Sequence, residues 1–196
     1  GGVLMSATLE PLDVFGKVSG LDALRADGRP VVERTYTLPF PAENRASWLV
    51  DATPFTAHNR GDPDENTNPA SWTRTRDEYA HALRALARSP GNVLVGMPNY
   101  REAGWAGEYL REAVEKPVLV DESSRNSETE ELKRRFFAGE GKVLVTSTRG
   151  TLTEGVDYDG DKLATCAVVG VPLVNIGSPR VRAVRRAYGD AFGSDV

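Results

Sequence analysis

The chain has 196 residues, of which 40% are hydrophobic and 27% charged, and its formal net charge is −4. This composition is typical of a folded domain with a core and excludes a disordered chain. No apolar run approaches the roughly 20 residues of a membrane helix, and no basic segment with a following apolar stretch indicates a signal peptide. We therefore expect a cytosolic protein with no membrane partner.

The residues that most often bind metals are few. The chain has one cysteine, Cys166, and two histidines, His58 and His81. A single cysteine excludes an intrachain disulfide, and these three residues are too few for a usual zinc or iron–sulfur site. The apolar run around Cys166 predicts a buried structural thiol. The negative net charge argues against a simple electrostatic nucleic-acid binder, although a local strip of arginines can still hold a strand.

The first third of the chain has a weak periodic pattern. Short strands are expected over residues 3–8, 31–38 and 48–52. A short helix is expected over 10–19, with Pro11 in its first turn, where a missing N–H does no harm. Glycines and a proline up to about residue 30 indicate a linker and a domain boundary. The segment 57–72 is rich in Asn, Asp, Pro and Gly, which predicts an exposed loop.

Helices and strands alternate regularly from about residue 75. We expect helices over 75–89, 100–115, 127–138 and 179–192, and strands over 92–97, 117–120, 142–146 and 164–171. The strands are short continuous apolar runs, which is typical of strands buried on both faces of a parallel sheet. The predicted fold class is therefore α/β, with a mostly parallel sheet flanked by helices. Ligands of such folds bind beyond the carboxyl ends of the strands.

Three segments bear on nucleotide chemistry and argue against it within these residues. The pair Gly141-Lys142 lacks both the first glycine and the hydroxyl residue of a phosphate-binding loop. The apolar run that ends at Asp121-Glu122 resembles a metal-binding carboxylate pair, but without a phosphate loop we expect ordinary acids at a strand end. Residues 77–81, Asp-Glu-Tyr-Ala-His, resemble a DEAH box, but they fall in an amphipathic helix.

The segment Thr146–Tyr158 follows a predicted strand and is the richest in functional groups. It reads TSTRGTLTEGVDY and combines hydroxyls, an arginine, two glycines and two acids. Glycines let the backbone approach a ligand closely, and the arginine fork suits a phosphate. From composition alone, an ordinary polar loop explains the segment about as well as a binding site.

The order of several segments resembles the XPD/DinG family of superfamily-two DNA helicases. Arg149–Tyr158 resembles motif V of that family, and Leu4–Leu9 resembles its motif III. The segment from Pro39 to Arg45 resembles the entry to the second motor domain. Met97-Pro98-Asn99-Tyr100 resembles motif IV, which often has Ser where Asn99 stands. The segment from Gly170 through the last helix resembles the approach to motif VI.

The resemblance implies a RecA-like fold and a particular division of the chain. Residues 1–29 would be the tail of the first motor domain and a linker, and residues 30–196 the second RecA-like domain, truncated before motif VI. The chain contains no glutamine, so the Q-x-x-G-R of motif VI is absent from it. We interpret the chain, which begins Gly1-Gly2-Val3, as a piece of a longer protein; a natural start after processing is the alternative.

The resemblance also implies a function for the parent protein. It would be an ATP-dependent DNA helicase, with 5′ to 3′ polarity, that couples ATP hydrolysis to single-strand translocation and duplex unwinding in DNA repair. ATP and Mg²⁺ would bind between two motor domains, and an iron–sulfur cluster would lie, if anywhere, before residue 1. Partners would be single-stranded DNA, duplex junctions and the first motor domain, in the cytoplasm at the nucleoid or in the nucleus. The piece alone is expected to be inactive.

The family's roles carry over to ten positions. For the DNA side these are Asn99, Tyr100, Thr148, Arg149 and Gly150; for the ATP side Gly155 and Asp157; for coupling Ser6, Thr8 and Glu154. No catalytic or metal-binding residue is predicted in this chain. For Tyr100, base stacking and packing on the following helix are both open, and the basic last helix is expected to be a solvated face.

Two other functions remain open from the sequence. One is a catalytically silent RecA-like module that binds nucleic acid or a protein partner. The other is a small-molecule enzyme that uses Asp121 and Glu122, which requires a closed pocket beside those acids.

Overall fold

The computed structural model describes residues 2–6, 9–37, 41–122, 126–153, 156–171 and 177–193. The chain divides into two compact units. Unit 1 comprises Gly1–Trp48 and Asn175–Val196, and unit 2 comprises Leu49–Val174. This division follows packing, whereas the predicted boundary at residue 29 concerns the organisation of a longer protein and stays a prediction.

Unit 1 contains three helices and one 3₁₀ turn among its described residues. They are α1 (Leu12–Ser19), α2 (Leu21–Ala26), η1 (Ala42–Asn44) and α7 (Pro179–Phe192). The helices predicted over 10–19 and 179–192 are confirmed. The linker predicted up to residue 30 is wrong in part, because α2 forms within it. Gly20, with a φ of 80°, ends α1 in the left-handed region and lets α2 begin at once.

The three strands predicted before residue 53 are wrong. The described residues 2–6, 31–37 and 48–52 have no regular structure. Val3, Met5 and Leu49 are 86%, 89% and 99% exposed. A strand is stabilised by hydrogen bonds and packing from its neighbours, not by apolar side chains alone. None of these segments joins the described sheet, so their apolar residues have no partner strand.

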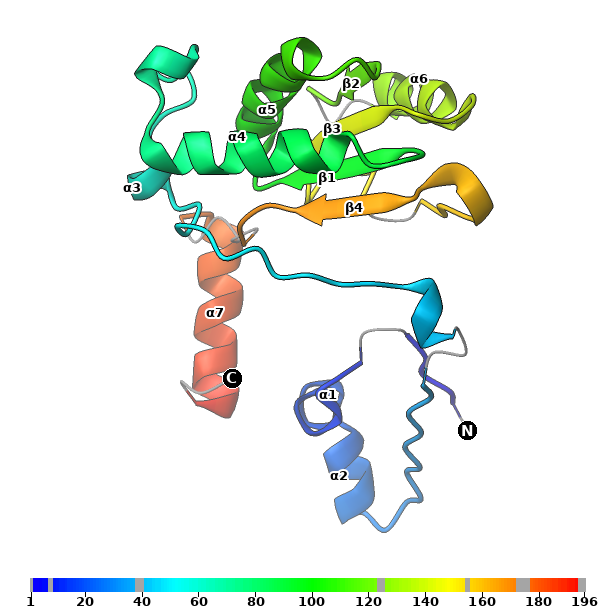
Figure 1. Ribbon diagram of the computed structural model, residues 1–196. Coiled ribbons are helices and arrows are strands. Elements are labelled where there is room, and N and C mark those ends of the chain that lie inside the picture. Colours follow the sequence, from blue (N-terminus) through cyan, green and yellow to red (C-terminus); the bar gives the residue numbers. More distant parts are fainter. Residues whose placement is uncertain are drawn as a thin grey trace. The chain divides into compact units, whose positions relative to one another are not determined.

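Unit 2 is built on a four-stranded, all-parallel sheet. Its strands are β1 (Val93–Met97), β2 (Val118–Val120), β3 (Val143–Ser147) and β4 (Thr165–Val168). They lie in the order β2-β3-β1-β4, as Figure 1 shows. Every residue of β1 and β3 is buried, as their unbroken apolar runs predict. This is the α/β, RecA-like arrangement that the sequence predicts.

Helices cover the sheet on both faces. α4 (Arg74–Ala87) and α5 (Tyr100–Ala113) contribute to one core cluster with alternate residues of β1 and β3. α6 (Asn126–Phe137) contributes Phe136 to a second cluster with Leu94 and Leu144, which point to the other face. The bounds of these helices and of β1, β2 and β3 agree with the predictions within two residues. No helix among the described residues is long and apolar enough to cross a membrane.

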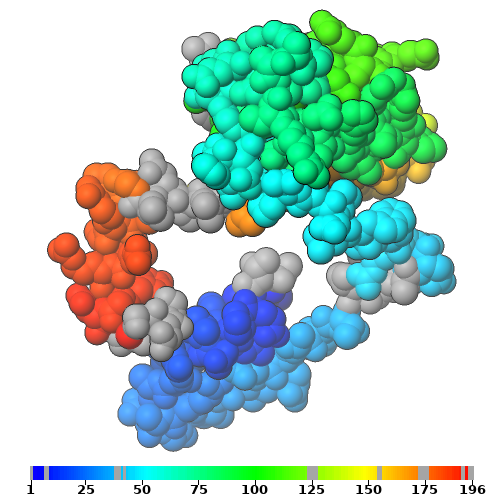
Figure 2. Space-filling model, turned by 60° about the vertical axis from the view of Figure 1, so that its left-hand side comes forward, coloured from blue at the N-terminus to red at the C-terminus, as the bar shows by residue number. Residues whose placement is uncertain are grey.

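The segment 57–72 before α4 is exposed at most positions, as its composition predicts, but it is not a plain loop. It contains α3 (Ala57–Arg60) and η2 (Pro69–Ser71) and packs against α4 and α5. Trp72 lies edge-on to Trp105 and Tyr109 of α5, and Phe55 lies against Tyr79 of α4. In Figure 2 this cyan segment lies directly on the green helices. Polar composition predicted that most of these residues are exposed, but it did not predict the aromatic contacts that anchor the segment on α4 and α5.

The buried thiol predicted at Cys166 is also wrong. Cys166 is exposed on β4, which is an edge strand of the described sheet. β4 ends at Val168, three residues earlier than predicted, and Val168 is itself 67% exposed. An apolar run predicts burial only where helices cover both faces of its strand, and β4 is covered incompletely by the described residues.

Tyr158 packs against the second core cluster and is expected to make the free energy of unfolding depend on pH. Its ring packs edge-on against Phe136 and Phe137, and its hydroxyl donates to the carbonyl of Leu152. Burial is the main cause that raises the pKa of Tyr158 to about 12, and the nearby Cys166 adds to it. Below pH 10, tyrosine is neutral in both the folded and the unfolded chain. Above pH 10, the unfolded chain ionises first.

We therefore expect the free energy of unfolding to fall as the pH rises from 10 towards 12. The loss attributable to Tyr158 is about 1–2 kcal/mol, after an allowance for its partial exposure. Urea unfolding of the unmodified protein and of Tyr158→Phe across this pH range measures it. The variant should lose part of the slope. Equal slopes for the two proteins would contradict the assignment.

Candidate nucleic-acid interface

The carboxyl ends of β1 and β3 lie side by side, and the connections that follow these two strands lead to opposite faces of the sheet. Met97 and Ser147, the last residues of these strands, are register partners. After β1 the chain enters α5 on one face of the sheet, and after β3 it runs to Leu152 in the core of the other face. Such a switch point is where open α/β sheets bind ligands. It brings together the predicted segments around Tyr100 and Arg149.

Asn99 fixes the first turn of α5. Its side-chain Oδ1 accepts a hydrogen bond from the backbone N–H of Glu102 at 3.0 Å, which makes it the N-cap. Serine and asparagine are both good N-caps. The asparagine that stands where the sequence comparison expects serine therefore preserves this local structure.

Hydrogen bonds hold the loop after β3 onto the end of β1. The backbone N–H and the hydroxyl of Thr148 both donate to the carbonyl of Met97, at 2.8 and 3.1 Å. The Thr153 hydroxyl reaches the carbonyls of Ser147, Thr148 and Gly150. The loop is thus tied at both of its ends, while the side chain of Arg149 is exposed. Arg149 therefore extends from a backbone that these hydrogen bonds hold in place.

A small polar cluster supports this loop from below. A Cβ added to Gly150 would lie 2.9 Å from the Tyr100 hydroxyl and 3.1 Å from the Thr146 hydroxyl. The Thr146 hydroxyl donates to Oδ2 of Asp121 at 2.8 Å, and both residues are buried. Burial, and secondly the charge of Asp121, raise the pKa of Tyr100. Only glycine fits between the loop and this cluster, so Gly150 serves close packing.

This cluster contains Asp121 and Thr146, which were not among the predicted site residues. It also defines the surroundings of Tyr100, which was. Asp121, which the sequence suggested as an ordinary acid at a strand end, is a buried acceptor for Thr146. Thr146 was not predicted to have a role, and its position at the end of an apolar strand was the available signal. The Tyr100 hydroxyl is buried and has no hydrogen-bond partner among the described residues. It packs under Gly150, a contact with the loop after β3 that the sequence did not predict.

The family comparison bears on this same sheet. A family model described as "Helicase C-terminal domain" matches residues 82–195, more than half of the chain. The chain belongs to the helicase C-terminal domain family. The matched region begins within α4 and contains the whole parallel sheet, α5 and the loop after β3.

A buried charge cluster joins this helicase domain to the segment that precedes α4. Arg76 on α4 and Glu102 on α5 have side chains that are 0% and 1% exposed, and they form a two-pronged ion pair at 3.0 and 3.3 Å. Arg60, 15% exposed, donates from Nε to the same carboxylate at 2.7 Å. The Arg76 guanidinium also stacks on Trp105, 4.5 Å from the ring centre. The positive charge of the two arginines therefore exceeds the negative charge of the one buried carboxylate.

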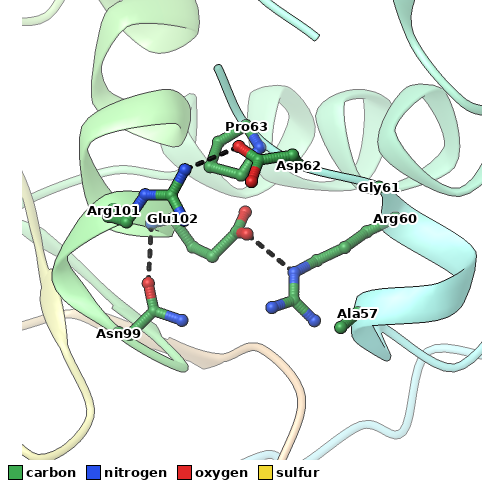
Figure 3. Close-up of a pocket in the computed structure, with 8 residues that line it drawn as sticks. All are labelled: Ala57, Arg60, Gly61, Asp62, Pro63, Asn99, Arg101 and Glu102. Atoms are coloured by element: carbon green, nitrogen blue, oxygen red, sulfur yellow. Dashed lines mark hydrogen bonds and ion pairs between the residues drawn. The ribbon is translucent and has the colours of Figure 1, made fainter. Parts of the chain in front are cut away.

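A cavity of about 370 Å³ opens beside this cluster, as Figure 3 shows. It is lined by residues from α3, the following turn and the start of α5: Ala57, Arg60, Gly61, Asp62, Pro63, Asn99, Arg101 and Glu102. Arg101 is held at the rim by Asp62 and Asp64, at 2.6 and 2.7 Å. The pKa of Asp62 is lowered, first by a hydrogen bond from the Asp64 backbone and then by Arg101.

Sequence reasoning missed the charge cluster, although a signal was present. Arg76 lies at helical spacing from Ala80, Leu83 and Ala87, which are buried on the apolar face of α4. Glu102 lies one turn before Ala106 on the buried face of α5. A charged residue on an apolar stripe indicates a buried ion pair, but the partner is identified only when two helices are packed together.

The remaining predicted site residues fall outside this interface or outside the description. Asp157 is exposed after the loop, and Ser6 lies in unit 1. Thr8, Glu154 and Gly155 lie outside the described residues. Within the described part of the chain, no group of three or more His, Cys, Asp or Glu side chains can hold a metal ion. Residues 77–81 lie in α4, as the helical interpretation of the DEAH-like segment predicts.

Proposed function

We propose that this chain is the second motor domain of a DNA helicase of the XPD/DinG type. The parent protein would couple ATP hydrolysis to 5′ to 3′ movement along a single strand and to duplex unwinding in DNA repair. Membership of the helicase C-terminal domain family supports the motor role. The order of motif-like segments from Leu4 to Gly170 supports the finer assignment.

One observation carries the DNA side of this proposal. The segments around Tyr100 and Gly150, 50 positions apart in the sequence, touch at the switch point of the sheet. Arg149 is exposed from the loop that this contact supports. An arginine on a rigid backbone binds a phosphate with little loss of conformational entropy. We assign DNA contacts to this edge, with these residues as candidates: Asn99, Tyr100, Thr148, Arg149 and Gly150.

The ATP side is assigned to Gly155 and Asp157, with Asp157 near the ribose. Phosphoryl transfer requires charge stabilisation from both sides of the nucleotide. This chain has no phosphate-binding loop and no Q-x-x-G-R segment, and its described residues offer no metal site. The phosphate loop and the Mg²⁺ ligands would therefore come from the first motor domain of the same protein. Ser6, Thr8 and Glu154 would couple nucleotide state to the DNA contacts.

Replacing Arg149 with alanine in the full-length protein tests the DNA assignment. We expect the Kd for a fluorescent oligothymidine to rise about tenfold at 50 mM salt. The slope of log K against log salt should fall by about 0.7, since one phosphate contact is lost. Fluorescence anisotropy over a range of salt concentrations measures both. Arg84→Ala, which removes an exposed arginine from α4, is the matched control and should change neither.

The ATPase activity of the same proteins separates the remaining possibilities. At saturating DNA, Arg149→Ala should retain most of the DNA-stimulated ATPase activity. Unchanged DNA binding with a large loss of ATPase activity would place Arg149 on the nucleotide side. A full-length protein that binds DNA but shows no DNA-stimulated ATPase activity would instead be a catalytically silent RecA-like module.

A further inference from the structure

We infer that helix α7 carries a docking face for the sugar–phosphate backbone of duplex DNA, formed by Arg182, Arg185 and Arg186. This inference rests on the proposed function, because it adds a duplex contact to a protein whose single-strand contacts are assigned to the segments after β1 and β3. None of the ten positions to which the family resemblance gives a role lies in α7. The arginines of this helix therefore have no part in those assignments.

α7 differs from the other long helices of the chain in its balance of charges. Its sequence, PRVRAVRRAYGDAF, has four arginines and a single acid, Asp190. In contrast, α6 has three acids and three basic residues, and α5 has three acids and two arginines. Positive charge is therefore concentrated on α7, although the chain as a whole has a net charge of −4. Such a local excess attracts a polyanion regardless of the total charge.

The four arginines of α7 are exposed, and none forms an ion pair with a described residue. Elsewhere on the surface, acids one turn away neutralise exposed arginines: Glu78 pairs with Arg74 on α4, and Glu131 pairs with Arg134 on α6. On α7 no described carboxylate competes with an external anion for the guanidinium groups. An arginine in this state can form two parallel hydrogen bonds to a phosphate.

Three of these arginines share one face of the helix, which we call the basic face. Arg182, Arg185 and Arg186 are three and four residues apart, so they lie side by side over about 6 Å of helix length. Gly189 continues this face one turn later, and a Cβ added there would meet nothing within 4 Å. The basic face is therefore open, and its arginines can contact one ligand together.

The basic face suits duplex DNA better than a single strand. Proteins bind single strands in grooves, with aromatic side chains on which the bases stack. Tyr188 of α7 does not belong to the basic face, because it lies at helical spacing from Val181 and Val184 on another stripe. Duplex DNA carries one negative charge per about 1.7 Å of its axis on its outer surface. A row of arginines on a convex helix can contact several of these phosphates without reading any base.

Anisotropy titrations with the full-length protein test the docking face. The two probes are fluorescein-labelled dT15 and the same strand joined to a hairpin duplex of about 20 base pairs. We expect the unmodified protein to bind the tailed duplex about tenfold more tightly than dT15 at 50 mM NaCl. The double variant Arg185→Ala with Arg186→Ala should abolish this difference and leave the affinity for dT15 unchanged. Its salt slope for the tailed duplex should fall by about 1.8, for two lost phosphate contacts.

A second Arg-Arg pair in the chain provides the matched control. Arg134→Ala with Arg135→Ala removes two exposed arginines from α6 and should retain the whole difference between the probes. Gly189→Glu keeps every arginine and places a carboxylate one turn after Arg185 and Arg186, where it can pair with them. It should also abolish the difference. Because glutamate favours a helix more than glycine does, this variant keeps the test decisive if the double alanine variant fails to fold.

Equal affinities of the unmodified protein for the two probes, or a difference that survives in both α7 variants, would overturn the docking face. The proposed function stands in that case if Arg149→Ala still weakens binding of dT15. Tailed-duplex binding that depends on α7, in a protein without affinity for dT15, would support the docking face and overturn the single-strand assignment. A final arm uses vesicles of equimolar phosphatidylserine and phosphatidylcholine. Sedimentation of the protein with these vesicles that is lost in Gly189→Glu would identify an anionic membrane as the partner and overturn the inference.

Discussion

Replacing Glu102 with glutamine is expected to lower the free energy of unfolding by about 3–5 kcal/mol. The substitution removes the negative charge that neutralises Arg76, whose side chain is 0% exposed. It also places an amide donor against the donors of Arg76 and Arg60. An uncompensated buried charge cannot regain hydration without unfolding, so the whole desolvation cost of Arg76 falls on the folded state. Urea denaturation followed by tryptophan fluorescence measures the loss, because Trp105 lies beside Arg76.

An exposed ion pair of similar geometry provides the control. Glu131 pairs with Arg134 on α6 through both carboxylate oxygens, and its side chain is 50% exposed. Glu131→Gln should cost less than about 1 kcal/mol, because solvent screens the pair and rehydrates Arg134. The double variant Glu102→Leu with Arg76→Met should recover much of the stability lost in Glu102→Gln. A loss for Glu102→Gln no larger than that for Glu131→Gln would refute the buried-charge account.

The second large effect is expected at Gly107, where α5 crosses β2. A Cβ at this position would lie 2.3 Å from Cγ2 and 3.1 Å from Cγ1 of Val120. Val120 is a strand residue that is 8% exposed, so it has little room to move. Gly107→Ala should therefore destabilise unit 2 by about 1–3 kcal/mol through overpacking, despite the better helix propensity of alanine. Thermal and urea unfolding measure the change.

Gly104, one turn earlier on the same helix, makes the matched control. A Cβ there meets nothing within 4 Å. Gly104→Ala should accordingly stabilise the protein by about 0.5–1 kcal/mol, since only helix propensity changes. The two substitutions are chemically identical and should have opposite signs. Stabilisation by both would show that α5 does not pack against Val120 at this distance.

The sequence by itself determined the helices and the first three strands from α4 onward. Continuous apolar runs such as Val93–Met97 and Val143–Ser147 predict strands buried on both faces, because only a covered parallel sheet satisfies them. Helical spacing of apolar residues predicted α4, and α5 and α6 were also predicted within two residues. The same patterns failed for residues 3–8, 31–38 and 48–52. Their short apolar runs do not reveal whether a partner strand is present, so a local apolar pattern cannot predict a strand in these segments.

The candidate site was predictable only in part. Residue types and order indicated Asn99, Tyr100 and the loop at Arg149, and strand-end logic predicted that these segments share one edge. The sequence did not show that Tyr100 packs under Gly150 instead of facing solvent. That contact depends on the register of β1 with β3, which places two strand ends side by side.

Tertiary structure alone decided the surroundings of Glu102. Arg60, Arg76 and Glu102 are separated by up to 42 positions, and no sequence pattern shows that they pair with one another. They meet because Trp72 and Phe55 anchor the preceding segment on α4 and α5. Local periodicity specifies which face of an element is apolar, whereas the pairing of buried charges depends on how separate elements pack. The loop after β3 resembles a helicase motif in its sequence, and packing showed what holds that loop in place.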